Sequence, residues 1–219
     1  MHEEILLPVF GLPVHTALMI YIIIGLAIFS LIVGNGFKLV PGKLQSLLEL
    51  VAVTFMDMVE ENMGHNGKKY FPFILTIAVY IFISNALGLF PGLLPPTANL
   101  NTTVGLALVV FFATHVIGIK EHGLKYLKHF IGPVWWLAPL MMPIEIIGHL
   151  ARPLSLSLRL FGNMMGHEQI VGVLLILMPV AYPLLAVSTA LGVLVIFIQA
   201  YIFALLSMLY IGAALEEAH

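Results

Sequence analysis

Long runs of apolar residues decide what this chain can fold into. Five stretches, residues 16–33, 70–90, 103–119, 134–177 and 184–214, are predominantly apolar, and a helix of about 20 such residues crosses a bilayer. Hydrophobic residues make up 61% of the sequence and charged residues 9%, whereas a typical soluble domain is about 25% charged. A soluble core of this size cannot hide so much apolar surface. The sequence therefore predicts an all-α, polytopic membrane protein with about five crossings.

A sixth segment, residues 44–63, has a different pattern. Its apolar residues recur at helical spacing, with Gln45, Glu49, Glu60 and Glu61 between them. This pattern predicts an amphipathic helix, which we expect at the membrane interface or docked on a partner, not spanning the bilayer.

The lysines lie in two of the loops. All of them follow the first or the third apolar stretch: Lys38, Lys43, Lys68, Lys69, Lys120, Lys125 and Lys128. The positive-inside rule places both loops in the cytoplasm. We therefore expect an outside amino terminus, a cytoplasmic carboxyl terminus and a single membrane domain over 1–219. Its parts are 1–69 with the first span and the amphipathic helix, 70–133 with two spans, and 134–219 with a long helical hairpin.

The last two stretches are longer than a bilayer requires. As helices of about 44 and 31 residues they would extend roughly 66 and 46 Å, against a hydrocarbon core of about 30 Å. A modest tilt of about 20° does not absorb the excess. We predict two strongly tilted, antiparallel helices, with Pro139, Pro143 and Pro153 as possible kink points.

Most polar residues of the helix predicted over 134–177 fall on one narrow stripe. We take 100° per residue and set Arg159 at 0°. Within about 40° of it lie Arg152, Asn163 and Glu145. Near 80° lie His149 and His167. Glu168 falls on the opposite face.

The predicted depths of these residues separate two kinds of chemistry. Glu145 and His149 lie toward the cytoplasmic half, Arg159 near the middle, and His167 and Glu168 toward the outer half. Arginine stays protonated at physiological pH, so it attracts carboxylates but relays no proton. Carboxylates and imidazoles do exchange protons. Ionisable groups inside a membrane usually mark ion pathways or ligand sites.

Some of these residues have a second interpretation. For Arg152, snorkelling or pairing with Glu145 is as good an explanation as a channel role. His149 and His167 suit hydrogen-bonded packing as well as proton exchange. His115, near the cytoplasmic end of the third span, is expected to be an ordinary packing residue.

The last helix offers a partner for the arginine. Gln199 lies near its middle, roughly level with Arg159, and an amide hydrogen-bonds a guanidinium without neutralising it. The GxxxG spacing of Gly162 and Gly166 lets another helix approach closely.

Several motifs together resemble subunit a of the F-type ATP synthase. They are "PLSLSLRLFGN" at 153–163, "GHE" at 166–168, "IQAYIFALLSMLYI" at 198–211 and "SNALGLFPG" at 84–92. The resemblance covers nearly the whole chain. It implies a stator subunit of a bacterial inner membrane that faces a rotating ring of c subunits, alongside b-type peripheral stalk subunits and membrane lipids. It further implies a proton-translocating subunit that is no enzyme by itself, with no cofactor, metal or nucleic acid.

The resemblance also assigns roles to single residues. Arg159 would be the essential arginine between two offset half-channels, with Gln199 as its partner. The outer path would hold Glu168, His167 and Asn163, and the inner path Glu145 and His149. Some members of the family carry glycine where His167 stands and histidine where Gly192 stands.

Two other functions compete with this one. A haem- or quinone-binding subunit needs histidines at matched depth on facing helices, but His149 and His167 lie about 27 Å apart along one helix and the last stretch has no histidine. A secondary transporter often shows internal repeats, and none is evident in the sequence.

Overall fold

The computed structural model describes residues 14–34, 38, 41–90, 94–123, 126, 138–177 and 182–216. All regular structure in these residues is helical, as the composition predicts. The α-helices are α1 (Val14–Gly34), α2 (Lys43–Met63), α3 (Phe71–Ala86), α4 (Leu100–His122), α5 (Ala138–Ile176) and α6 (Tyr182–Leu215). Short 3₁₀ helices η1 (His65–Tyr70), η2 (Leu87–Leu89) and η3 (Pro96–Ala98) flank the inner helices.

The predicted membrane segments correspond closely to these helices. Within the described residues, four helical segments are long and apolar enough to cross a membrane: Val14–Gly34, His65–Leu89, Leu100–His122 and Pro183–Leu215. The fifth predicted crossing is α5, which has ample length but carries Glu145, Arg152, Arg159 and Glu168. The amphipathic helix predicted at 44–63 is α2.

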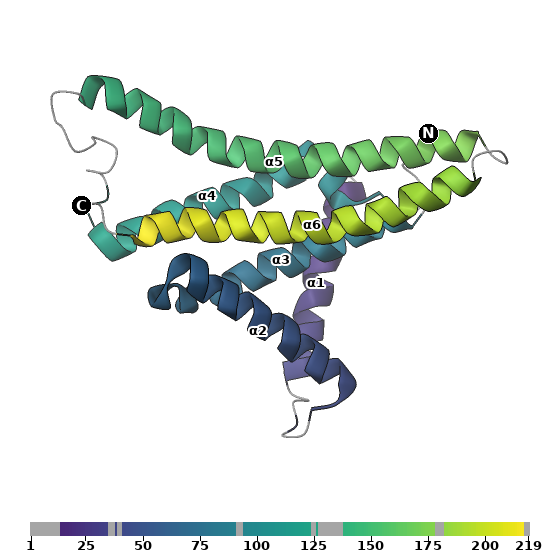
Figure 1. The fold of residues 1–219 in the computed structure, drawn as a ribbon, viewed down its shortest axis with the longest axis horizontal. Coiled ribbons are helices and arrows are strands. Elements are labelled where there is room, and N and C mark those ends of the chain that lie inside the picture. Colours follow the sequence, from purple (N-terminus) through teal and green to yellow (C-terminus); the bar gives the residue numbers. More distant parts are fainter. Residues whose placement is uncertain are drawn as a thin grey trace.

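The two longest helices lie side by side and antiparallel (Figure 1). α5 has 39 residues and α6 has 34, so they extend roughly 58 and 51 Å. Figure 1 also shows α1 running steeply across their common direction. α1 and the α5–α6 pair therefore cannot all stand upright in one bilayer.

Pro143 and Pro153 lie inside α5 without interrupting it. Each removes one backbone N–H from the helical ladder. Figure 1 shows a gentle curve along α5 and no break, so the expected kinks take this mild form. Pro139 falls in the first turn, where the missing N–H costs little.

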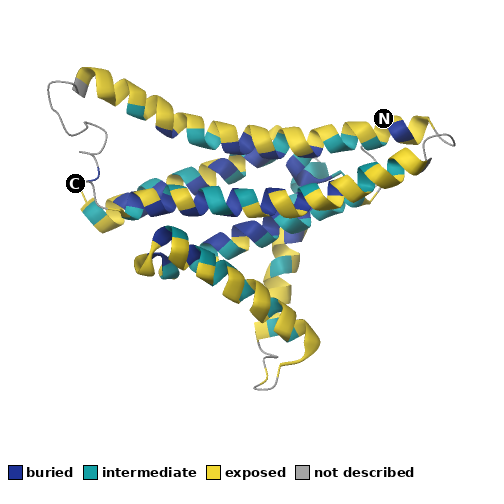
Figure 2. Cartoon of the chain, viewed as in Figure 1, coloured by how far each residue is buried: buried dark blue, intermediate teal, exposed yellow. Residues whose placement is uncertain are grey.

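One face of α5 packs into the bundle. Leu156, Leu160 and Met164, each one turn from the next, are buried against α3, α4 and α6. Their spacing of four residues fixes the rotation of α5, because it keeps one stripe inward. The other face of α5 is largely exposed (Figure 2).

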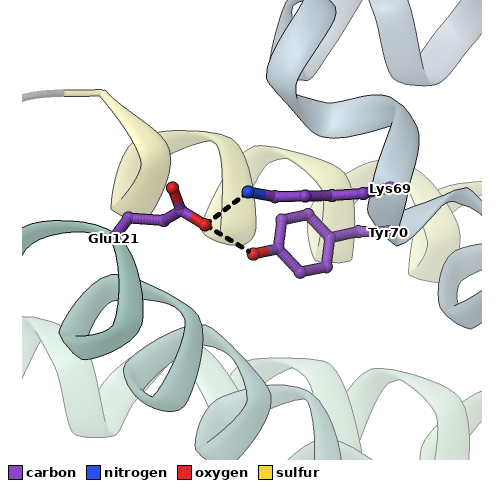
Figure 3. Close-up of polar contacts among 3 residues, drawn as sticks. All are labelled: Lys69, Tyr70 and Glu121. Atoms are coloured by element: carbon purple, nitrogen blue, oxygen red, sulfur yellow. Dashed lines mark hydrogen bonds and ion pairs between the residues drawn. The ribbon is translucent and has the colours of Figure 1, made fainter.

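Side chains join the two lysine-bearing loops. Lys69 and Tyr70, between α2 and α3, both contact the carboxylate of Glu121 at the end of α4 (Figure 3). In the same region the Lys68 ammonium lies 2.9 Å from Glu60, and this hydrogen bond lowers the pKa of the Glu60 carboxyl. The contact between Lys69 and Glu121 therefore holds the start of α3 beside the end of α4.

Candidate functional site

Arg159 lies on the exposed face of α5. This exposure follows from the buried stripe of α5, since Arg159 is one residue away from buried Leu160 and points to a different side. Within the described part of the chain, no carboxylate lies within ion-pair distance of its guanidinium. A permanent cation is therefore presented outward from an apolar helix.

Small residues surround this arginine on the same face. Ser155, Gly162 and Gly166 are all exposed and fall within about 60° of Arg159 around the helix. A Cβ atom added at Gly162 or Gly166 would meet no atom within 4 Å. No described helix of this chain uses the GxxxG spacing, so the close approach that it permits is open to a helix from outside.

The predicted neighbours of Arg159 lie in two environments. Asn163, one turn further along α5, is exposed like the arginine. Gln199 of α6 is only 7% exposed. Among the described residues, no hydrogen bond joins Gln199 to Arg159, because the amide lies inside the bundle and the guanidinium outside it.

The carboxyl-terminal half of α5 carries His167 and Glu168. A Cβ atom at Gly192 of α6 would lie 2.7 Å from Nε2 of His167, so the imidazole occupies the space that this glycine leaves. Glu168 is half-buried, and His15 lies in the first turn of α1. Nδ1 of His15 is buried and has no hydrogen-bond partner among the described residues.

The amino-terminal half of α5 carries Glu145 and His149. Oε1 of Glu145 lies 3.3 Å from Nε2 of His149, and the two side chains are 33% and 8% exposed. The ring of His115 on α4 lies next to them, 5.3 Å from the His149 ring between centroids. His115 therefore joins the expected pair of Glu145 and His149 in a cluster of three titratable groups.

Tyr126 and Arg152 border this cluster. The Tyr126 hydroxyl shares a hydrogen bond of 2.9 Å with Nδ1 of His115, and burial raises the pKa of the Tyr126 hydroxyl. The Arg152 guanidinium lies over the ring of Tyr210 on α6, 5.4 Å from its centroid. The structure therefore adds another interpretation of Arg152, a cation–π contact inside the protein.

A small cavity lies at the centre of the cluster. His115, His149, Arg152 and Tyr210 line it together with apolar residues, and its volume is about 10 Å³. That is close to the smallest space which a single water molecule needs.

Arg159 separates the two ends of this arrangement. Along α5 it lies about 21 Å from Glu145 and about 14 Å from Glu168. The helix thus carries proton-exchanging groups toward both ends and a fixed cation between them.

Sequence reasoning missed some of these neighbours. It assigned His115 to ordinary packing, and it gave no role to His15 or Tyr126. The signal for His115 was present, because a histidine within a membrane span is costly unless it has a partner. Tyr126 lies beyond the end of α4, so helical periodicity does not reveal its position.

Comparison with known proteins gives consistent results. A family profile described as "ATP synthase A chain" matches residues 14–212. A protein named ATP synthase subunit a from Geobacter sulfurreducens is 56% identical over 198 residues, which cover 90% of this chain and 86% of the relative. ATP synthase subunit a 1 from Syntrophotalea carbinolica is 53% identical over 210 residues, or 96% and 89% of the two chains.

Proposed function

Because this chain belongs to the ATP synthase A chain family, we propose that its α5 helix forms the stator face along which ring carboxylates load and unload protons. The observation that carries the proposal is the exposed, unpaired Arg159 on a face of small residues. A membrane protein rarely leaves such a cation without a partner. A carboxylate on a neighbouring c subunit is the partner that fits.

Two half-channels follow from the groups on either side. On the outer side, Glu168, His167 and Asn163 would pass a proton to a ring carboxylate. The neutralised carboxyl can enter lipid, where a charged one is too costly. After nearly one turn of the ring, the proton would leave through His149 and Glu145.

Arg159 keeps the two paths apart. It cannot release its own proton, and it repels one that approaches directly. An unprotonated ring carboxylate about 4 Å away would gain roughly 4 kcal/mol of attraction at an effective dielectric constant near 20, before desolvation is counted. This attraction favours one position of the ring and still lets the carboxylate leave. The membrane potential supplies about 2.3 kcal/mol per charge per 100 mV.

The remaining assignments concern the assembly. The lysine-bearing loops and the carboxyl terminus would face the cytoplasm, and the amino terminus the outside of the inner membrane. Partners would be the c-ring, b-type stalk subunits and lipids. The chain itself would make no ATP, since nucleotide chemistry belongs to other subunits.

ATP-driven proton pumping tests the proposal. We expect Arg159→Ala in the assembled enzyme to reduce pumping by inverted vesicles at least about 100-fold, because the barrier between the paths is lost. Normal pumping at normal levels of assembled enzyme would refute the role of Arg159.

A further inference from the structure

His115 belongs to α4, yet its contacts join it to the Glu145 end of α5. Its ring lies 5.3 Å from the His149 ring between centroids, and the His149 Nε2 is 3.3 Å from a Glu145 oxygen. The exposed fraction rises from 8% at the His149 side chain to 33% at the Glu145 side chain. Of these two groups Glu145 is therefore the nearer to the surface, and His115 itself is partly buried.

Tyr126 fixes the orientation of the His115 ring. The hydroxyl bonds to Nδ1 at 2.9 Å, and Tyr126 is only 6% exposed although it follows the end of α4. Gly118 makes room for it, since a Cβ atom there would lie 2.7 Å from Cζ of the Tyr126 ring. With Nδ1–H donating to the hydroxyl oxygen, the other ring nitrogen of neutral His115 is left free to accept a proton.

The cavity gives the two histidines a shared space. Both rings line it, and so do the Arg152 guanidinium and the Tyr210 ring. The nearby permanent cation disfavours two charged imidazoles at once, so the pair is suited to carrying one proton at a time.

We propose that His115 is a proton-exchanging residue of the Glu145-side path, held in place by Tyr126. This inference rests on the proposed function of α5. It extends the path from one helix to two and adds a residue from the third predicted span.

Each step moves one proton. During ATP-driven pumping, a hydrated proton on the cytoplasmic side protonates Glu145. The O–H bond of Glu145 breaks as an N–H bond forms on His149, and an N–H bond of His149 then breaks as one forms at the free ring nitrogen of His115. His115 then passes the proton toward the ring carboxylate and returns to neutral. ATP synthesis runs the same steps in reverse. Of the groups facing His115, Arg152 keeps its charge and Tyr126 keeps its proton throughout.

The test uses the complete ATP synthase in inverted membrane vesicles, where the assay buffer bathes the cytoplasmic face. The rate of ATP-driven pumping is measured against buffer pH and divided by the amount of assembled enzyme. His115→Gln keeps a polar side chain of similar size but cannot be protonated. Tyr126→Phe keeps His115 and removes only its hydrogen bond. His122→Gln is the matched control, because His122 lies on the same helix and does not line the cavity.

We expect His115→Gln to lower the rate about tenfold and to remove one limb of the pH profile. Tyr126→Phe should shift that limb with a smaller loss of rate, and His122→Gln should match the wild type. A wild-type rate and profile in His115→Gln would overturn the inference. So would a loss of assembled enzyme with an unchanged profile, since that marks a structural role.

Arg159→Ala in the same vesicles separates this inference from the function on which it rests. If Arg159→Ala abolishes pumping while His115→Gln does not change it, only the role of His115 fails. If Arg159→Ala pumps normally, the proposed function fails first.

Discussion

Two arginines on one helix meet opposite surroundings. Arg152 is half-buried, lines a cavity and lies over the Tyr210 ring. Arg159, two turns further along α5, is exposed and has no ion-pair partner among the described residues. The first cation contacts groups within the chain, and the second is the one that we propose meets the ring.

Replacement by lysine should give the largest contrast between the two positions. Arg159→Lys keeps a charge but loses the planar guanidinium, and a desolvated lysine can release its proton, which arginine does not. We expect at least about a tenfold loss of pumping and a faster passive proton leak. Arg152→Lys should stay near wild type, since lysine also makes a cation–π contact. Equal losses at both positions would break the comparison.

The next largest effect should come from the outer side of Arg159. His167→Gly removes an imidazole that fills the space over Gly192, and we expect about a tenfold loss of pumping. Adding Gly192→His returns an imidazole to that space and should restore most of the rate. Failure of the double variant, with normal assembly, would mean that the position on α5 matters as well as the imidazole.

A double-mutant cycle measures what Arg152 contributes within the chain. Arg152→Ala and Tyr210→Leu are made singly and together, and the thermal stability of the purified complex is measured. The cation–π contact at 5.4 Å predicts a coupling energy of about 1 kcal/mol. Additive effects would show that the contact is incidental.

The smallest effect is expected far from both arginines. Lys69→Ala removes an exposed ion pair with Glu121, and such pairs are weak because water screens them. We expect pumping within about twofold of wild type. Glu121→Gln, which also loses the charge, should behave alike. A large loss in either variant would mean that the two loops act in the path and do not only hold the helices together.

The sequence predicted the helices better than their contacts. Apolar length located α1, α3, α4 and α6 to within a few residues, because the bilayer imposes one scale on all of them. Helical periodicity also put Arg159 and Asn163 on one face of α5. It could not tell which face would be buried, since that depends on Leu156, Leu160 and Met164 packing against other helices.

Contacts between distant segments lay beyond this reasoning. The approach of His115 to His149 depends on how α4 crosses α5, and neither helix encodes the crossing in its own pattern. Matching depth suggested that Gln199 would meet Arg159. Depth says nothing about rotation around α6, and the structure buries Gln199 while it exposes the arginine.

Cross-linking tests most directly whether the exposed face of Arg159 meets the ring. The chain has no cysteine, so one introduced thiol is unique within it. Ser155→Cys lies on the exposed face one turn from Arg159, whereas Ser157→Cys is buried at 1% exposure. In native membranes carrying a ring subunit with a single cysteine, Ser155→Cys should form disulfides with the ring and Ser157→Cys should not. Ring disulfides from neither position, with the enzyme assembled, would contradict the account.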